Sequence, residues 1–363
     1  MVGQQMLLKS GRVLHRASPY EVSAFVRSHI GNHSIELRSN SAKATLNYKK
    51  LGSIGLSKLT YGDHVVVSNS SGLEQEYHLQ MVLEGSCKVR YSESEVFVLT
   101  SGAGALINPS DPVALEYSDD CVKLIVKVPV ALINSCCIDQ VGYVPSGGLH
   151  FNAGAFQLEE DGAFWKLIEL LCLEADQREL ANHPVGTSIG ALVVTKLMEV
   201  LPHNLPATVG SSEDADFFGL IDSYIDSAAG ADVAAVDLAR LANVSVRTLY
   251  DRFKRAKGIT PHAYIKTRRL RRIYHRLHAS TGSVRSVTEV ALEYGFCHLG
   301  RFSSEYKMLF GELPSEALRR ASLPAKSSRL TGDRLPVLAS GSSPQNASIA
   351  RNDSAESLTL AGI

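Results

Sequence analysis

The chain of 363 residues is long enough for two domains with cores of their own, and its 45% hydrophobic and 20% charged residues are typical of globular proteins. It has no uninterrupted apolar run of about 18 residues and opens without an apolar segment of signal-peptide length, which excludes a membrane-spanning protein and predicts a cytoplasmic one. The net charge of zero hides an asymmetry, because residues 236–320 hold 17 Lys and Arg against 7 Asp and Glu, whereas residues 1–212 hold 16 against 21. A basic segment of this kind fits either nucleic-acid binding or a solvated basic face.

The first part of the chain predicts a β-rich domain. Residues 1–50 alternate only weakly and predict no clear element. Residues 52–128 contain short segments rich in Val, Ile, Leu and Tyr, which Gly85, Gly102 and Pro109 separate. Short strands at this spacing predict a barrel or a sandwich, which we place at about residues 50–130.

Two helices are expected at about residues 155–201, at the end of an N-terminal domain that we assign to residues 1–202. The first carries a stripe of apolar residues at helical spacing, and the second is the apolar segment 186–201. The stripe consists of Phe164, Leu167, Ile168 and Leu171. It serves either as a dimer interface or as the face that packs onto the barrel, and the sequence favours neither.

A change of composition separates this domain from the next. Residues 203–212 contain Pro, Gly and Ser with few large apolar residues, which predicts a linker. Residues 213–321 are predicted to be entirely helical. Residues 322–363 are rich in Ser, Pro, Asn, Ala and Gly and are expected to be disordered, because such a segment buries too little apolar surface to order itself.

The strongest feature of the sequence is an internal repeat between residues 236–264 and residues 287–317. Ala239 matches Ala291, and after one extra residue in the second copy four further pairs follow with a constant offset. These pairs are Leu249 with Phe302, Phe253 with Tyr306, Gly258 with Gly311, and Pro261 with Pro314. A shared spacing of this length indicates two copies of one structural unit.

Each copy has the pattern of a helix-turn-helix. In the first copy, Asn243 tolerates the left-handed conformation of a tight turn, Ser245 can cap the second helix, and Gly258 ends it. In the second copy, Gly295 makes the turn and Gly311 ends the helix. A long helix that begins at Pro261 would hold the two second helices apart, at about 34 Å if they lie in successive major grooves.

The residues that face inward identify the outer face of each second helix. In the first unit Leu249 and Phe253 point inward, so the outer face and the start of the helix are predicted to meet DNA. The candidates there are Ser245, Arg247, Thr248, Tyr250, Asp251 and Lys254. Arg247 is the candidate for bidentate pairing with guanine, although a phosphate contact remains an alternative. Asp251 either reads a base or forms an ion pair with Arg247 or Lys254.

The second unit presents smaller side chains. Its candidates are His298, Gly300, Arg301, Ser303, Ser304 and Lys307. Hydroxyl groups read bases weakly, so this helix is expected to position the DNA backbone more than to read bases.

Residues 236–320 resemble the DNA-binding domain of the AraC/XylS family, and the XylS-like branch in particular. The segments LARLANVSVRTLYDRFK, GITPHAYIKTRRL and EVALEYGFCHLGRFSSEYKMLFGELPSEALRR carry the resemblance. It implies a seven-helix domain, a promoter target in double-stranded DNA, contact with RNA polymerase, and activation of transcription. We therefore expect an all-α double helix-turn-helix domain at residues 213–321.

The N-terminal half resembles the family's cupin-like ligand-binding domain through YHLQMVLEGSCKVR and LTSGAGALINPSDPVALEY. This resemblance implies a domain that senses a small effector, by analogy an aromatic acid or another catabolic compound, and that can form a homodimer. It predicts an effector-responsive activator of a catabolic or metabolic operon, and it names no effector-binding residue.

Three alternatives remain. The first is a cupin-type metal enzyme fused to a DNA-docking module, but such enzymes need an HxH pair. Here His78 stands alone, with His64 upstream and Glu84 downstream, so we expect no metal, no cofactor and no catalytic residue. The second is a DNA-repair protein, which would need a cysteine cluster. The six cysteines form no CxxC pair and are expected to be reduced and mostly buried. The third is a purely architectural DNA-binding protein.

Overall fold

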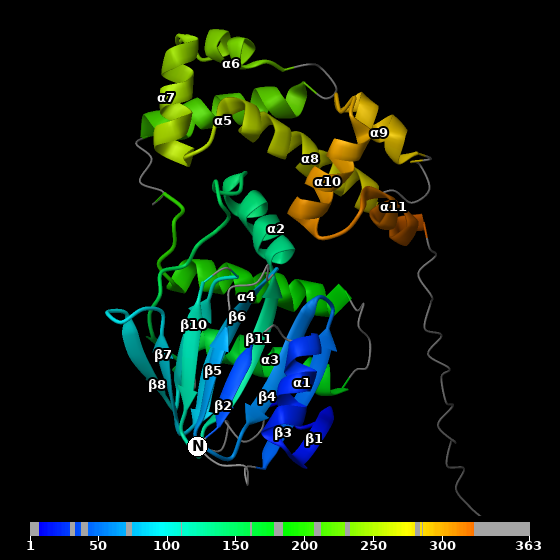
Figure 1. Cartoon of the computed structure of the whole chain (residues 1–363). Helices are drawn as coiled ribbons and strands as arrows, with labels where there is room; N and C mark the ends of the chain where they lie inside the picture. Colours follow the sequence, from blue (N-terminus) through cyan, green and yellow to red (C-terminus); the bar gives the residue numbers. More distant parts are fainter. Residues whose placement is uncertain are drawn as a thin grey trace, which may run out of the picture. The chain divides into compact units, whose positions relative to one another are not determined.

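The structure is a computed structural model, in which the N-terminal domain holds two antiparallel sheets and the C-terminal domain is helical (Figure 1). It describes residues 7–29, 33–37, 43–69, 75–109, 111–159, 162–177, 184–206, 212–228, 233–279, 284 and 286–322. The predicted disordered tail therefore lies outside the described residues, apart from its first position.

The larger sheet has the strand order β1-β3-β4-β11-β6-β9-β12. Its strands are β1 (Arg12–Ala17), β3 (Ala44–Leu51), β4 (Ile54–Thr60), β11 (Val122–Pro129), β6 (Glu76–Glu84), β9 (Ala103–Ile107) and β12 (Phe156–Gln157). The smaller sheet has the order β2-β5-β10-β7-β8. Its strands are β2 (Ser34–Leu37), β5 (Val65–Asn69), β10 (Val113–Tyr117), β7 (Ser86–Arg90) and β8 (Val96–Thr100). The prediction of a β-rich N-terminal domain is confirmed.

Strand β11 is buried on both faces, and its side chains alternate between two cores. Ile125 points into the cluster between the two sheets, whereas Leu124 and Val126 belong to the cluster on the opposite face. Double burial explains why β11 is nearly continuously apolar. Lys123 interrupts this apolar sequence, yet its side chain is fully buried, with its Nζ atom 3.5 Å from the Cys87 Sγ atom.

Four helices accompany the sheets: α1 (Pro19–His29), α2 (Val130–Val141), α3 (Ala163–Gln177) and α4 (Pro184–Val200). Three members of the predicted apolar stripe on α3, Phe164, Ile168 and Leu171, are buried in the core together with Trp165. The stripe therefore packs inward, which is the second of the two uses that the sequence allowed. None of the described helices is both long and apolar enough to cross a membrane.

The first 50 residues hold more structure than their weak pattern indicates. Strands β1 to β3 and helix α1 all begin before residue 50. Strand β1 is almost entirely exposed and β2 is half exposed, so neither needs the apolar alternation by which a strand is recognised in a sequence.

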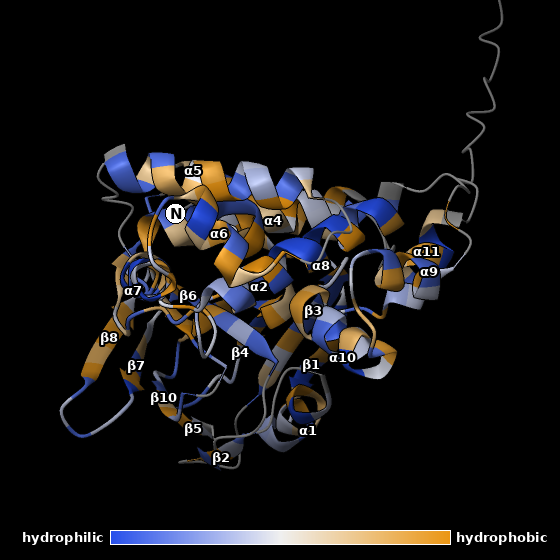
Figure 2. Ribbon diagram, turned by 90° about the horizontal axis from the view of Figure 1, so that it is seen from above, coloured by the Kyte–Doolittle hydropathy of each residue, from blue (hydrophilic) through white to orange (hydrophobic). Residues whose placement is uncertain are grey.

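Seven helices are described in the C-terminal domain: α5 (Ser212–Ser227), α6 (Ala235–Leu241), α7 (Val246–Lys257), α8 (Pro261–Ala279), α9 (Val287–Glu293), α10 (Leu299–Phe310) and α11 (Pro314–Ser322). Figure 2 shows hydrophilic and hydrophobic residues alternating along α5 and α8, as expected of helices with one buried face. The spacing of Leu270, Ile273, Tyr274 and Leu277 predicts one apolar stripe on α8. Leu270, Ile273 and Leu277 are buried, whereas Tyr274 is half-buried.

The turn and cap residues adopt the predicted conformations. Asn243 has a φ of 52° and Gly295 a φ of 82°, so both turns use the left-handed region. The Ser245 side chain accepts a hydrogen bond of 3.0 Å from the Thr248 amide. Gly258 and Gly311 are left-handed C-caps of α7 and α10. Both predicted helix-turn-helix units are therefore confirmed.

Candidate nucleic-acid interface

Helix α7 is fixed from the inside by two fully buried side chains, Leu249 and Phe253. Because these point inward, the opposite face of the helix is left to solvent. All of the predicted contact residues of this helix are exposed, namely Ser245, Arg247, Thr248, Tyr250, Asp251 and Lys254. The ion pairs between described residues include none from Asp251 to Arg247 or Lys254. The outer face is therefore available for hydrogen bonding to a ligand.

Helix α10 has the same arrangement, with Phe302 and Tyr306 buried below it. Among its predicted contact residues, Ser303 is half-buried and the others are exposed, namely His298, Gly300, Arg301, Ser304 and Lys307. The Ser304 hydroxyl donates to the Gly300 carbonyl at 3.1 Å, so part of its hydrogen-bonding capacity is used within the helix. This helix offers fewer free polar groups than α7 does.

A carboxylate that the sequence did not single out holds two cations near α10. Glu305 Oε1 lies 3.0 Å from Lys266 Nζ on α8 and 3.0 Å from Arg301 Nε on α10. Burial raises the pKa of Glu305, but hydrogen bonds from Lys266 and Arg301 outweigh it, so the pKa lies below its usual value. The ionised carboxylate thereby fixes the position of the otherwise exposed Arg301 side chain.

Helix α8 also contributes to the surface between the two units. His262, Lys266 and Arg269 line a hollow of about 510 Å³ together with Tyr250 of α7 and Arg301 of α10. Sequence reasoning missed these three residues as candidates. Their spacing of four and three residues places them on one helix face, and that pattern could have identified them.

Other basic residues of α8 form ion pairs and hydrogen bonds within the domain. Arg268 pairs with Asp222 at 3.6 Å, and the Arg272 guanidinium donates to the carbonyl of Ile225 at 3.3 Å. Arg276 pairs with Glu293 at 2.5 Å. The charge excess of this segment is therefore partly neutralised inside the domain.

The described residues contain no group of three His, Cys, Asp or Glu side chains that could hold a metal ion. His64 lies 2.9 Å from Glu116 rather than beside His78. His78 is a half-buried residue of β6, and burial together with Lys127 and Lys123 lowers its pKa to about 3. All six cysteines are free thiols, and only Cys297 is exposed.

Comparison with known proteins identifies both domains. Residues 238–320 match the model of a helix-turn-helix domain, and residues 22–201 match the model of an AraC-binding-like domain. The chain is 38% identical over 318 residues to the XylDLEGF operon transcriptional activator 3 of Pseudomonas putida, covering 87% of this chain and 94% of that protein. It is 33% identical over 163 residues to the probable thc operon regulatory protein of Rhodococcus erythropolis, covering 44% of this chain and 49% of that protein.

Similar solved structures include the AraC-like transcriptional activator CuxR, with a TM-score of 0.39 and 16% identity over 72% of this chain and 95% of that one. The structure of a probable AraC family transcriptional regulator from Rhodopseudomonas palustris has a TM-score of 0.28 and 32% identity, over 29% of this chain and 97% of that one. The assignment rests on the sequence matches, which cover both domains. The chain belongs to the AraC/XylS family of DNA-binding transcription regulators.

Proposed function

We propose that the protein is an effector-responsive activator that binds promoter DNA of a catabolic or metabolic operon and contacts RNA polymerase there. The observation that carries the proposal is the pair of helix-turn-helix units with exposed polar outer faces, in a chain that also has an AraC-binding-like domain. Its relatives are named as activators of the XylDLEGF operon. The effector class suggested by the family resemblance is an aromatic acid or another catabolic compound.

In this proposal the two recognition helices have different roles: α7 reads bases and α10 contacts the DNA backbone. On α7, Arg247 pairs with a guanine while Tyr250 and Asp251 contact neighbouring bases, and Lys254 holds a phosphate. On α10, exposed groups such as His298 and Lys307 position the DNA backbone. The sequence specificity of the protein then comes mainly from the first unit.

The test is the binding of the full-length protein to the DNA upstream of its gene, compared with scrambled DNA. Arg247→Ala is expected to lose about 1–3 kcal/mol of binding free energy, concentrated at one base pair. The matched control is Arg252→Ala on the same helix, because the Arg252 guanidinium lies over the Phe217 ring at 4.7 Å, away from the outer face. A uniform small loss across all sequences would make Arg247 a phosphate contact. Absence of specific binding by the unchanged protein would refute the proposal.

We further propose a cytoplasmic homodimer without enzymatic activity. The support for a dimer is the exposed apolar surface on α3 and α4, where Leu170, Leu173 and Leu192 are 41%, 53% and 53% exposed. Leu173→Arg is expected to shift sedimentation from dimer to monomer. Val98→Arg, at an equally exposed position on β8, should leave it unchanged.

A further inference from the structure

The hollow of about 510 Å³ in the DNA-binding domain lies between the two helix-turn-helix units. Tyr250 of α7 lines one side of it, and His298 and Arg301 at the start of α10 line the other. Figure 1 shows α8 extending between these two helices. Tyr250, His298 and Arg301 are also exposed residues of the predicted DNA contact surfaces. The hollow therefore opens on the side of the domain that carries both recognition helices.

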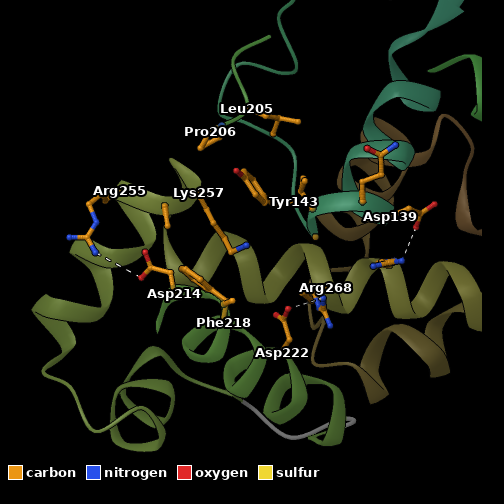
Figure 3. Close-up of a pocket in the computed structure, with 16 residues that line it drawn as sticks. Asp139, Tyr143, Leu205, Pro206, Asp214, Phe218, Asp222, Arg255, Lys257 and Arg268 are labelled. Carbon is orange, nitrogen blue, oxygen red and sulfur yellow. Dashed lines mark ion pairs between the residues drawn. The ribbon is translucent and has the colours of Figure 1, made fainter. Parts of the chain in front are cut away.

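The cations of α8 are divided between two faces of the helix. Arg268 pairs with Asp222 of α5 at 3.6 Å (Figure 3). His262, Lys266 and Arg269 share a different face, because they are four and three residues apart, and all three line the hollow. One face is therefore neutralised within the protein, whereas the other collects positive charge in a recess.

The lining of the hollow is strongly cationic. Lys266, Arg269 and Arg301 are permanent cations, and Glu305 is the one carboxylate among the described lining residues. Glu305 Oε1 lies 3.0 Å from both Lys266 Nζ and Arg301 Nε, so two positive charges share a single negative one. The side chains of Lys266 and Glu305 are only 34% and 15% exposed, so water and salt screen their charges incompletely. The hollow therefore attracts a further negative charge.

Arg269 lies beside the turn of the second helix-turn-helix unit. Its Nη1 atom is 3.4 Å from the position that a Cβ atom on Gly295 would occupy, and the residue is half-buried. A recessed side chain of this kind cannot enter a groove of the duplex, as an arginine on a projecting arm does. It can instead bind a group that projects toward it.

The geometry of DNA places such a group opposite the hollow. The recognition helices of two adjacent units occupy successive major grooves on one side of the duplex. Between two such grooves lies one minor groove, which a sugar-phosphate strand borders on each side. These strands project from the duplex and carry one negative charge per nucleotide. They match a recess with cationic walls in both shape and charge.

We propose that the hollow holds a sugar-phosphate strand at the border of this central minor groove, with Arg269 and His262 binding its phosphates. Helix α8 is then a third DNA-contacting element, and Lys266 contributes its charge while it stays paired with Glu305. This inference rests on the proposed function, because it needs both recognition helices to bind one duplex. Phosphates are the same at every nucleotide, so these contacts set the affinity and register of the protein but not its choice of sequence.

The first test measures the affinity of the full-length protein for promoter and scrambled DNA by fluorescence anisotropy over a range of salt concentrations. Arg269→Gln is expected to weaken binding of both DNAs by the same factor, about tenfold at low salt, and to reduce the slope of log affinity against log salt by about one. The matched control is Arg276→Gln, which removes the same charge from the same helix at a residue that pairs with Glu293 outside the hollow. It should leave the slope unchanged.

An added charge should have the opposite effect. Ala234→Lys places a cation at an exposed position of the lining and should strengthen binding of both DNAs by roughly threefold, with a steeper salt slope. Leu220→Lys adds the same charge at a residue of α5 that is 45% exposed and lies outside the lining. It should bind both DNAs like the unchanged protein. Circular dichroism melting of each variant confirms that it is folded.

The second test replaces single phosphates between the two recognition sites of the promoter with neutral methylphosphonates. The unchanged protein should lose several-fold in affinity at one or two of these positions. Arg269→Gln should lose little more there, because it already lacks the contact. Equal losses for both proteins, or no loss at any central phosphate, would overturn this proposal and leave the regulator function standing if the unmodified promoter is bound specifically. If the unchanged protein does not bind the promoter specifically, both proposals fail.

Discussion

At the scale of single residues, the first helix-turn-helix turn depends on the backbone of Asn243. Its φ of 52° lies in the left-handed region, and the Val244 amide next to it donates to the Ala239 carbonyl at 2.9 Å. Asn adopts this region at a lower conformational free-energy cost than most other residues with a side chain, and the cost is highest for β-branched residues. The turn therefore constrains the choice of residue even though the Asn243 side chain is exposed.

We predict that Asn243→Val lowers the free energy of unfolding by about 1–2 kcal/mol, because a β-branched residue is strained at this φ. Asn243→Gly should change it by only a few tenths of a kcal/mol, since glycine adopts the conformation freely. Urea unfolding followed by circular dichroism measures both. Equal losses for the two variants would show that the side chain, and not the backbone conformation, is what matters.

His78 gives a second prediction at this scale, for the dependence of stability on pH. Burial, and then Lys127 and Lys123, lower its pKa to about 3 from an ordinary value of 6.5. Below pH 6.5 the unfolded chain binds a proton at His78 that the folded chain does not bind. The free energy of unfolding therefore decreases as the pH is lowered from about 6.5 to about 3, by up to about 1.4 kcal/mol per pH unit. His78→Gln should flatten this slope in urea titrations between pH 7 and pH 4.5. His15→Gln at an exposed position should not, and a slope that is unchanged in His78→Gln would contradict the assignment.

At the scale of elements, Glu305 links α8 to α10 through Lys266 and Arg301. We predict that Glu305→Gln raises affinity for scrambled DNA several-fold and steepens its salt dependence, because it removes one negative charge between two cations of the proposed DNA-binding surface. Discrimination between promoter and scrambled DNA should fall, because Arg301 is no longer held in place.

Fluorescence anisotropy over a range of salt concentrations measures both effects. Glu213→Gln at the exposed start of α5 is the control, since it changes the net charge equally without touching α10. If both variants behave alike, net charge accounts for the result and Glu305 has no positioning role.

Several helix boundaries were predictable from the sequence because a residue there has a chemical preference for a helix end. Ser245 caps α7, Gly258 and Gly311 end α7 and α10, and Pro261 opens α8. Each of these residues has one dominant conformational or hydrogen-bonding preference, so a single sequence is enough to place it. The exposed face of α7 followed directly from its buried residues.

Other features depend on contacts between distant residues and could not be predicted in that way. Strand β1 has no fully buried residue; it pairs with β3, and only Leu14 and Ala17 pack against the core between the sheets. Lys123 looks like a surface residue in sequence but is fully buried beside Cys87. The role of Glu305 requires α8 and α10 to be adjacent, which no local pattern reveals. The contacts between residues far apart in the chain are therefore the part of the structure that the sequence did not predict.

At the scale of the whole molecule, the two helix-turn-helix units belong to different buried apolar clusters. Leu249 and Phe253 of the first unit belong to the same buried cluster as Ile168 and Val193 of the sensor domain. Phe302 and Tyr306 of the second unit belong to a separate cluster around α8. The first recognition helix is therefore packed continuously with the sensor domain, whereas the second is connected to it through α8 and the contacts of α2.

Helix α2 makes those contacts with its polar groups. The Asn134 side-chain amide donates to the Met308 carbonyl of α10 at 3.3 Å, and Asp139 pairs with Arg271 of α8 at 3.0 Å. An added Cβ on Gly311 would lie 2.6 Å from Ala131, so the two helices also approach closely. The ion pair is partly exposed, and its contribution is expected to be below about 1 kcal/mol.

We predict that Asp139→Arg loosens the contact between α2 and α8, because it places two like charges where an ion pair stood. Hydrogen exchange of the full-length protein should become faster in the last turn of α2 and in the middle of α8, by up to about fivefold for a loss of 1 kcal/mol. Arg271→Asp in the same chain reverses the charges and should restore most of the protection, which isolates the pairwise interaction from the effect of either single change. Lys166→Glu, which disturbs a pair on α3 far along the chain, is the control and should leave these amides unaffected. If the double variant exchanges as fast as Asp139→Arg alone, the attraction between these two side chains does not hold the domains together, and the apolar cluster shared with α7 and the contacts between α2 and α10 must do so.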